Sequence, residues 1–221
     1  IKMKSKKKIL IHICYDLFIR NYIQNNAFKE IEKKYDCYYI ASKDTVLLKN
    51  KIKKKKNFFG FYEFSKDEKK RASFNFLLHF FKYRHKSRAI NFTLKVMLKP
   101  KLKYYGEKKL NTILMFFPRI MSNLIKKIKL IIYSILNIKV RYLDNNSSGK
   151  KKLEKALTNI NPHLIISPIQ GWHIGHSEIN KIAKKRNIKT LAITDNWDNC
   201  SSKPMLKPHF DRFLVWGKQS L

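Results

Sequence analysis

The chain has 221 residues, of which 44% are hydrophobic, so it can bury a substantial core and is not a wholly disordered protein. Its formal net charge of +34 at pH 7 favours partners that carry negative charge, such as nucleotides, anionic lipids or nucleic acid. Arg supplies only eight of the 49 basic residues, which argues against sequence-specific reading of nucleic acid, because that depends on the planar guanidinium. The Lys excess is explained by AT-biased coding or, alternatively, by a membrane-surface role.

The cysteines and the apolar runs indicate the compartment. Cys14, Cys37 and Cys200 are odd in number and have no metal-like spacing, so we expect no disulfide framework and a reducing, cytoplasmic environment. The short apolar run near the N-terminus has no small-residue cleavage site and predicts a first strand, not a signal peptide. Lys or Arg interrupts the longer apolar runs, so we expect no membrane span.

The first part of the chain predicts a βαβ unit. A buried strand is expected over Lys8–Cys14, and a second over Asp36–Ser42. Between them, Phe28, Ile31 and Tyr35 supply the apolar face of a helix. The crossover between two such parallel strands should be right-handed.

A charge run and a long helical segment come next in the chain. Lys49–Lys56 reads as a solvated turn, and Phe58–Phe64 as another short strand. From Asp67 to about Val140 apolar residues recur at helical spacing, which predicts a helical insertion. Its apolar stripe either packs on the core or forms a cationic amphipathic surface on anionic lipid.

Strand and helix alternate again in the last third. A loop at Asp144–Gly149 precedes a helix that Asn161 and Pro162 should end, and Ser177 should cap a second helix running to about Arg186. Further strands are expected over His163–Ser167, Ile188–Thr194 and Asp211–Trp216. The order of elements predicts an α/β fold, a Rossmann-like parallel sheet with a helical insertion.

In such a sheet the candidate site follows from geometry. If strands 8–14, 163–167 and 188–194 are parallel neighbours, the loops after them meet at one edge, where ligands of open α/β sheets bind. We expect a substrate site to be formed there by polar and aromatic residues of these loops, namely Arg20, Asn21, Gln170, Trp172, Asp195, Asn196, Trp197, Asn199 and Ser201. A Trp at a strand end is suited to stacking on a sugar or base.

The acid–base candidates are two histidines and two aspartates, His173, His176, Asp16 and Asp198. Imidazole titrates near neutrality and suits a general base, although either His could simply bond the backbone. Two His three residues apart lack a third zinc ligand, so we predict no metal site. The aspartates could instead cap turns. No glycine-rich dinucleotide fingerprint follows the first strand, so no nicotinamide cofactor is expected.

Two stretches carry a family resemblance. Lys8–Cys14 followed by Asp16–Tyr22, and later Thr194–Asn199 through Leu214–Gly217, resemble the N-terminal half of bacterial GT-B-type glycosyltransferase-like proteins of surface polysaccharide biosynthesis. The resemblance implies two Rossmann-like domains facing a cleft, with the acceptor bound by the first. It also implies a second, donor-binding domain, which these 221 residues do not include.

The resemblance implies transfer of a sugar from a nucleotide-sugar donor, acting as co-substrate, to a glycan or lipid-linked acceptor. It further implies a place on the inner face of the cytoplasmic membrane, which would give the basic helices a purpose. Two alternatives stay open: a non-catalytic protein that binds an anionic membrane surface or, less readily, nucleic acid, and a sugar-nucleotide epimerase or hydrolase on the same fold.

Overall fold

The computed structural model describes residues 6–69, 72, 147–169, 173–195 and 210–215. The chain divides into two units, one formed by residues 1–69 and 146–221 and the other by residues 70–145. The second unit lies outside the described residues except for residue 72, and so does most of the predicted insertion at about 67–140. The strands and helices whose bounds the structure describes belong to the first unit.

The first unit is built on a parallel sheet of six described strands in the order β3-β2-β1-β4-β5-β6. The α/β fold with a Rossmann-like parallel sheet, predicted from the alternation of elements, is therefore confirmed. The strands are β1 (Lys8–Ile13), β2 (Asp36–Ser42), β3 (Phe58–Tyr62), β4 (Leu164–Ile169), β5 (Lys189–Thr194) and β6 (Arg212–Leu214).

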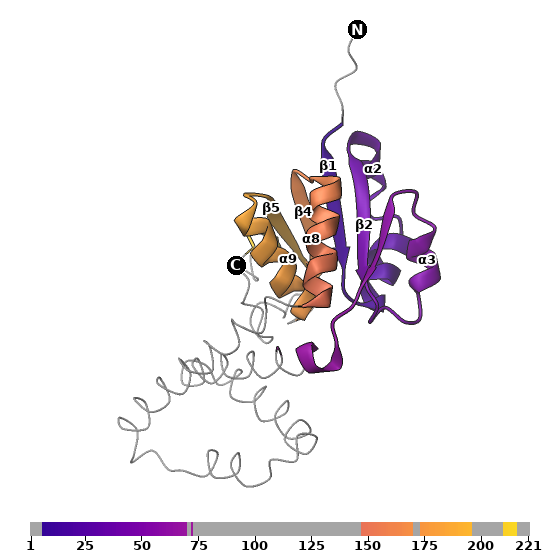
Figure 1. The fold of residues 1–221 in the computed structure, drawn as a ribbon. Coiled ribbons are helices and arrows are strands. Elements are labelled where there is room, and N and C mark those ends of the chain that lie inside the picture. Colours follow the sequence, from indigo (N-terminus) through magenta and orange to yellow (C-terminus); the bar gives the residue numbers. More distant parts are fainter. Residues whose placement is uncertain (1–5, 70–71, 73–146, 170–172, 196–209, 216–221) are drawn as a thin grey trace, which may run out of the picture. The chain divides into compact units, whose positions relative to one another are not determined.

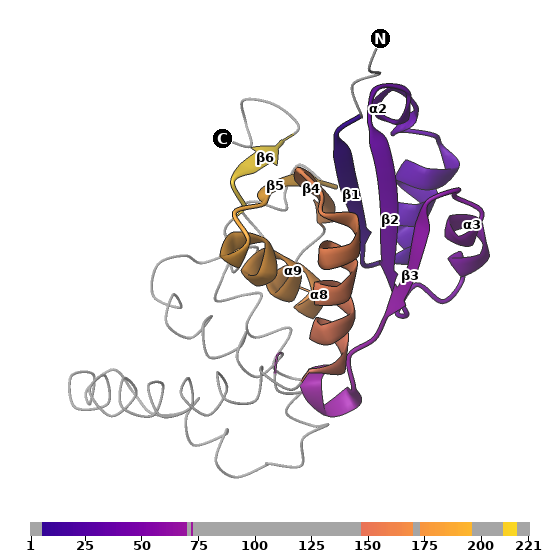
Figure 2. The ribbon, with the colours of Figure 1, turned by 45° about the horizontal axis from the view of Figure 1, so that its top comes forward.

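The chain runs outward from β1 in both directions, so two sets of connections cover opposite faces of the sheet (Figures 1 and 2). One set contains α1 (Asp16–Phe18), the π-helix η1 (Ile19–Gln24), α2 (Lys29–Lys34) and α3 (Lys49–Lys53). The other contains α8 (Ser148–Ile160) and α9 (Ile174–Lys185), which pack against each other. This two-sided cover explains why β1 is buried along its length.

Burial of apolar side chains sets the positions of these helices. Leu153 and Leu157 of α8 are fully buried, as the helical spacing predicts, and Ser147 caps α8 by accepting the N–H of Lys150. The helix ends where predicted, at Asn161, whose φ of 48° lies in the left-handed region that Asn tolerates.

Several predicted boundaries were wrong, including those of β3, which ends at Tyr62, and of β6, which spans only Arg212–Leu214. The charge run 49–56 contains helix α3, because the fully buried Ile52 anchors it despite its lysines. Strand β4 continues through Pro168 to Ile169, because its pairing with β1 ends at Ile166 and Pro168 therefore lies beyond that ladder. Helix α9 begins at Ile174, three residues before the expected cap at Ser177.

No helix among the described ranges is long and apolar enough to cross a membrane.

Candidate functional site

The candidate site lies at the carboxyl ends of the central strands. β1, β4 and β5 are parallel neighbours, as predicted, so the loops after them emerge at the same edge of the sheet. The strand order reverses direction between β1 and β4, which makes this pair the topological switch point (Figure 2). Ligands of open α/β sheets bind outside the carboxyl ends of strands at such a point.

Two of the predicted loops are joined there by side chains. Asn21 Nδ2, in the segment after β1, donates to Asp195 Oδ1, directly after β5, at 3.0 Å. The same amide accepts from Arg20 Nε through its oxygen at 3.2 Å. Asp195 is 7% exposed, whereas Arg20 is exposed, so the three residues form a polar chain that leads from the sheet edge to solvent.

Asp16, a predicted acid–base candidate, accepts hydrogen bonds from backbone N–H groups. Its Oδ2 accepts the N–H groups of Val46 and Leu47 at 3.0 and 3.2 Å, and its Oδ1 accepts that of Leu48 at 2.9 Å. The carboxylate therefore fixes the turn between β2 and α3. A general base would need at least one of these oxygens for the substrate.

We expect Asp16→Ala to lower the free energy of unfolding by about 1–2 kcal/mol, because three backbone donors lose a charged acceptor in a partly exposed turn. Urea unfolding followed by circular dichroism measures this change. Asp16→Asn is the matched control: its amide oxygen keeps one acceptor, so it should lie between the wild type and Ala. Wild-type stability of Asp16→Ala would contradict the turn-fixing role.

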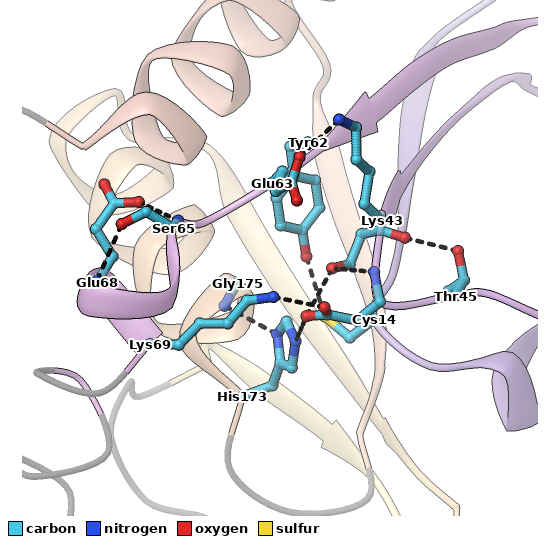
Figure 3. A network of polar contacts seen from close by, with 12 residues as sticks. Cys14, Lys43, Thr45, Tyr62, Glu63, Ser65, Glu68, Lys69, His173 and Gly175 are labelled. Carbon is cyan, nitrogen blue, oxygen red and sulfur yellow. Dashed lines mark hydrogen bonds and ion pairs between the residues drawn. The ribbon is translucent and has the colours of Figure 1, made fainter.

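His173, one of the two histidines predicted as a base, caps helix α9. Its Nδ1 accepts the N–H of Gly175 at 2.9 Å, so a neutral ring carries its proton on Nε2, which donates to Asp44 Oδ2 at 3.3 Å. Figure 3 shows His173 between Gly175 and the polar groups of the segment after β2. The hydrogen bond from His173 and that from Lys69 hold the pKa of Asp44 well below its usual range.

A buried polar cluster lies beside His173. His12, in β1, places Nε2 at 2.8 Å from the hydroxyl of Tyr62 and Nδ1 at 3.3 Å from Ser167 Oγ. Cys14 Sγ lies 3.6 Å from His12 Nε2 and 3.3 Å from the Tyr62 hydroxyl. His12 and Cys14 are both 0% exposed, so this cluster forms the floor of the carboxyl edge.

His176 completes the cluster from the first turn of α9. Its Nδ1 lies 3.8 Å from Cys14 Sγ, and its ring meets that of His12 edge to face at a centroid distance of 5.3 Å. Its Nε2 is buried and has no hydrogen-bond partner among the described residues. A buried polar atom left unpaired costs about 1–3 kcal/mol, so this ring is placed at an energetic cost.

Burial keeps every member of the cluster neutral. Desolvation, with a contribution from His173, lowers the pKa of His12 to about 3. Desolvation likewise lowers the pKa of His176 well below the usual value. It raises the pKa of the Cys14 thiol and of the Tyr62 hydroxyl.

Gly175 lets α9 approach this cluster. A Cβ at position 175 would lie 2.1 Å from the Tyr62 hydroxyl oxygen and 2.9 Å from His173 Nδ1. No side chain fits there without displacing Tyr62, whose oxygen bonds His12. The glycine is thus required by close packing at the start of the helix.

The structure brings together some predicted residues and adds others. Arg20, Asn21 and Asp195 gather at the carboxyl edge, as do His173 and His176. The remaining predicted residues lie outside the described residues: Gln170, Trp172, Asn196, Trp197, Asp198, Asn199 and Ser201.

The sequence reasoning missed His12, Cys14, Asp44 and Tyr62. A usable signal was present for the first two, because a histidine inside an otherwise aliphatic strand and a cysteine directly after it stand at the carboxyl end of the central strand. No local signal marks Tyr62, which ends β3 two strands away.

Comparison of the chain with protein-family models, with curated proteins and with solved structures found no match.

Proposed function

We propose that this chain is the acceptor-side half of a GT-B-type glycosyltransferase, which transfers a sugar from a nucleotide-sugar donor to a glycan or lipid-linked acceptor. The observation that carries the proposal is the gathering of polar side chains from the segments after β1, β4 and β5 at the switch point of a Rossmann-like sheet. This is where ligands of open α/β sheets bind.

The groups at this edge suit a polyhydroxylated ligand. Amide and carboxylate groups, as in Asn21 and Asp195, accept and donate to sugar hydroxyls, and their mutual hydrogen bond holds them in place. The guanidinium of Arg20 is exposed beside them and suits the phosphates of a donor or of a lipid-linked acceptor. The net charge of +34 also favours phosphate-bearing ligands and association with an anionic membrane face.

Among the predicted candidates that the structure describes, His173 is the best-placed general base. Asp44 bonds its Nε2 and would stabilise the imidazolium that forms when Nδ1 takes a proton from an acceptor hydroxyl. The acceptor would have to displace the Gly175 N–H from Nδ1, which is one hydrogen bond of about 1 kcal/mol.

The test distinguishes the role of His173 as a general base from its role as the N-cap of α9. In the full-length gene product, nucleoside diphosphate release is measured with a panel of UDP-, GDP- and dTDP-sugars and with liposome-bound or soluble glycan acceptors. His173→Asn retains a side-chain oxygen that can cap α9, so the fold should be kept, whereas kcat should fall by about 100-fold or more.

One control variant and two contrary results complete this test. His163→Asn alters an exposed histidine away from the carboxyl edge and should leave turnover unchanged. Wild-type kcat in folded His173→Asn would remove His173 from the reaction. If no nucleotide sugar is consumed, and the chain instead binds anionic liposomes in a salt-sensitive way, the non-catalytic alternative replaces the transferase.

A further inference from the structure

We propose that His12, Cys14 and His176 form a binding site for one Zn²⁺ ion at the carboxyl end of β1. One ligand atom from each of these residues lies within 4.8 Å of the others, which occurs for no other group of three His, Cys, Asp or Glu residues in the described ranges. The site is separate from the sugar transfer proposed above, which uses His173 as its base; His176, an acid–base candidate in the sequence, would be a metal ligand instead.

The distances match zinc coordination. With Zn–S near 2.3 Å and Zn–N near 2.0–2.1 Å, tetrahedral ligands S and N stand roughly 3.5 Å apart. Cys14 Sγ lies 3.6 Å from His12 Nε2 and 3.8 Å from His176 Nδ1. Both sulfur–nitrogen edges of the tetrahedron are therefore in place with only small side-chain adjustments.

The surroundings of His12 also fit a metal ligand. A ligating histidine usually donates its other ring N–H to a neighbouring oxygen, which fixes the ring and its tautomer. His12 Nδ1 faces Ser167 Oγ at 3.3 Å, which leaves the Nε2 lone pair for another partner. Nε2 lies 2.8 Å from the Tyr62 hydroxyl and 3.6 Å from Cys14 Sγ, so an ion would take the place of the Tyr62 hydrogen bond.

His176 would bind the ion through Nδ1, which lies 3.8 Å from Cys14 Sγ. The metal bond would offset part of the cost of burying this ring, whose Nε2 has no hydrogen-bond partner among the described residues. The ligands come from β1 and from the helix after β4, so an ion there would join the two strands of the switch point.

The ligand set selects the metal. When the ion binds, the Cys14 thiol releases its proton to solvent and becomes a thiolate. A thiolate with two imidazoles is a borderline-soft set that Zn²⁺ prefers, whereas Ca²⁺ and Mg²⁺ require oxygen ligands. The large positive net charge opposes loose surface binding of cations, so an ion that is retained marks an internal site.

The test uses tag-free protein without sugar substrates, so its result does not depend on the transferase proposal. We expect one Zn²⁺ per chain by elemental analysis after dialysis. Replacement by Co²⁺ should give the visible d–d bands of a tetrahedral ion and a near-ultraviolet thiolate-to-cobalt band. In Cys14→Ser that thiolate band should vanish, and affinity should fall by more than about 100-fold, since losing even an outer contact costs roughly 10–100-fold.

Matched controls identify the thiol and the imidazoles. Cys37→Ser removes another buried thiol, Cys200→Ser removes the third cysteine, and His163→Gln removes an exposed imidazole. All three should bind Co²⁺ with the wild-type spectrum, whereas His12→Gln and His176→Gln should lose tetrahedral bands. Circular dichroism identifies variants that fail to fold, and the wild-type spectrum tests the site without any variant.

The proposal is overturned if folded wild-type protein retains no Zn²⁺ and gives no thiolate-to-cobalt band. It is equally overturned if the band persists in folded Cys14→Ser, because the metal would then bind at another cysteine.

Discussion

Replacing Gly175 with Ala should lower the free energy of unfolding by about 3 kcal/mol or more. The new Cβ would lie 2.1 Å from the Tyr62 oxygen, so either α9 or Tyr62 has to move. Moving Tyr62 breaks its hydrogen bond to His12 in a buried place, where an unpaired group costs about 1–3 kcal/mol more. Urea unfolding of the two proteins measures the difference.

A double-mutant cycle with Tyr62→Phe distinguishes this clash from a general effect of alanine in the helix. The phenylalanine lacks the oxygen that the Cβ meets at 2.1 Å, and the next ring atom, Cζ, stands at 2.9 Å. Gly175→Ala should therefore cost less in the Tyr62→Phe background, with a coupling of about 1 kcal/mol or more. Strict additivity of the two substitutions would show that the clash is relieved in another way.

Acidification from pH 7 to pH 5 should lower the unfolding free energy of the metal-free protein by about 2 kcal/mol through His12, and His176 should add to this loss in the same direction. Both rings have a folded-state pKa below the ordinary value of 6.5, that of His12 being about 3. The unfolded chain therefore binds protons that the folded chain does not. The stability they contribute is complete above pH 6.5 and is lost as the pH falls toward the folded-state pKa.

Urea titrations at half-unit pH steps in the presence of a chelator measure the loss of stability, to which one such histidine contributes up to about 1.4 kcal/mol per pH unit. His12→Gln should remove the contribution of His12. His163→Gln, which changes an exposed ring, should leave the slope unchanged. A flat profile between pH 7 and pH 5 in the wild type would show that the buried rings accept protons in the folded state.

The sheet was predictable because its signal is local. Short aliphatic runs such as residues 9–11 and 191–193 are typical of parallel strands, and each run is short enough to be a strand. The meeting of three loops followed from the parallel order alone. Sequence reasoning failed where one buried residue overrides composition, as Ile52 does in a run of lysines.

The buried cluster around His12, Cys14 and Tyr62 was not predictable, for a different reason. Tyr62 and His12 are 50 positions apart in the chain, and Ser167 is 155 positions from His12, so no spacing rule joins them. His173 is not among the residues that helix N-caps prefer, and its capping role depends on a rotamer. Such contacts arise from tertiary packing, which the periodicity of apolar residues in the sequence does not reveal.

The residues on either side of the 70–145 unit, which follow β3 and precede α8, contact each other within the first unit. Glu68 Oε1 accepts the backbone N–H of Ser148 at 3.2 Å, so the two ends of that long segment are tied to each other within the first unit. The entropy of closing a loop grows only with the logarithm of its length. A short linker in place of residues 70–145 would therefore change the cost of closure by only about 2 kcal/mol. We therefore expect the Rossmann-like unit to keep its sheet when the segment at this position is replaced by one of very different length.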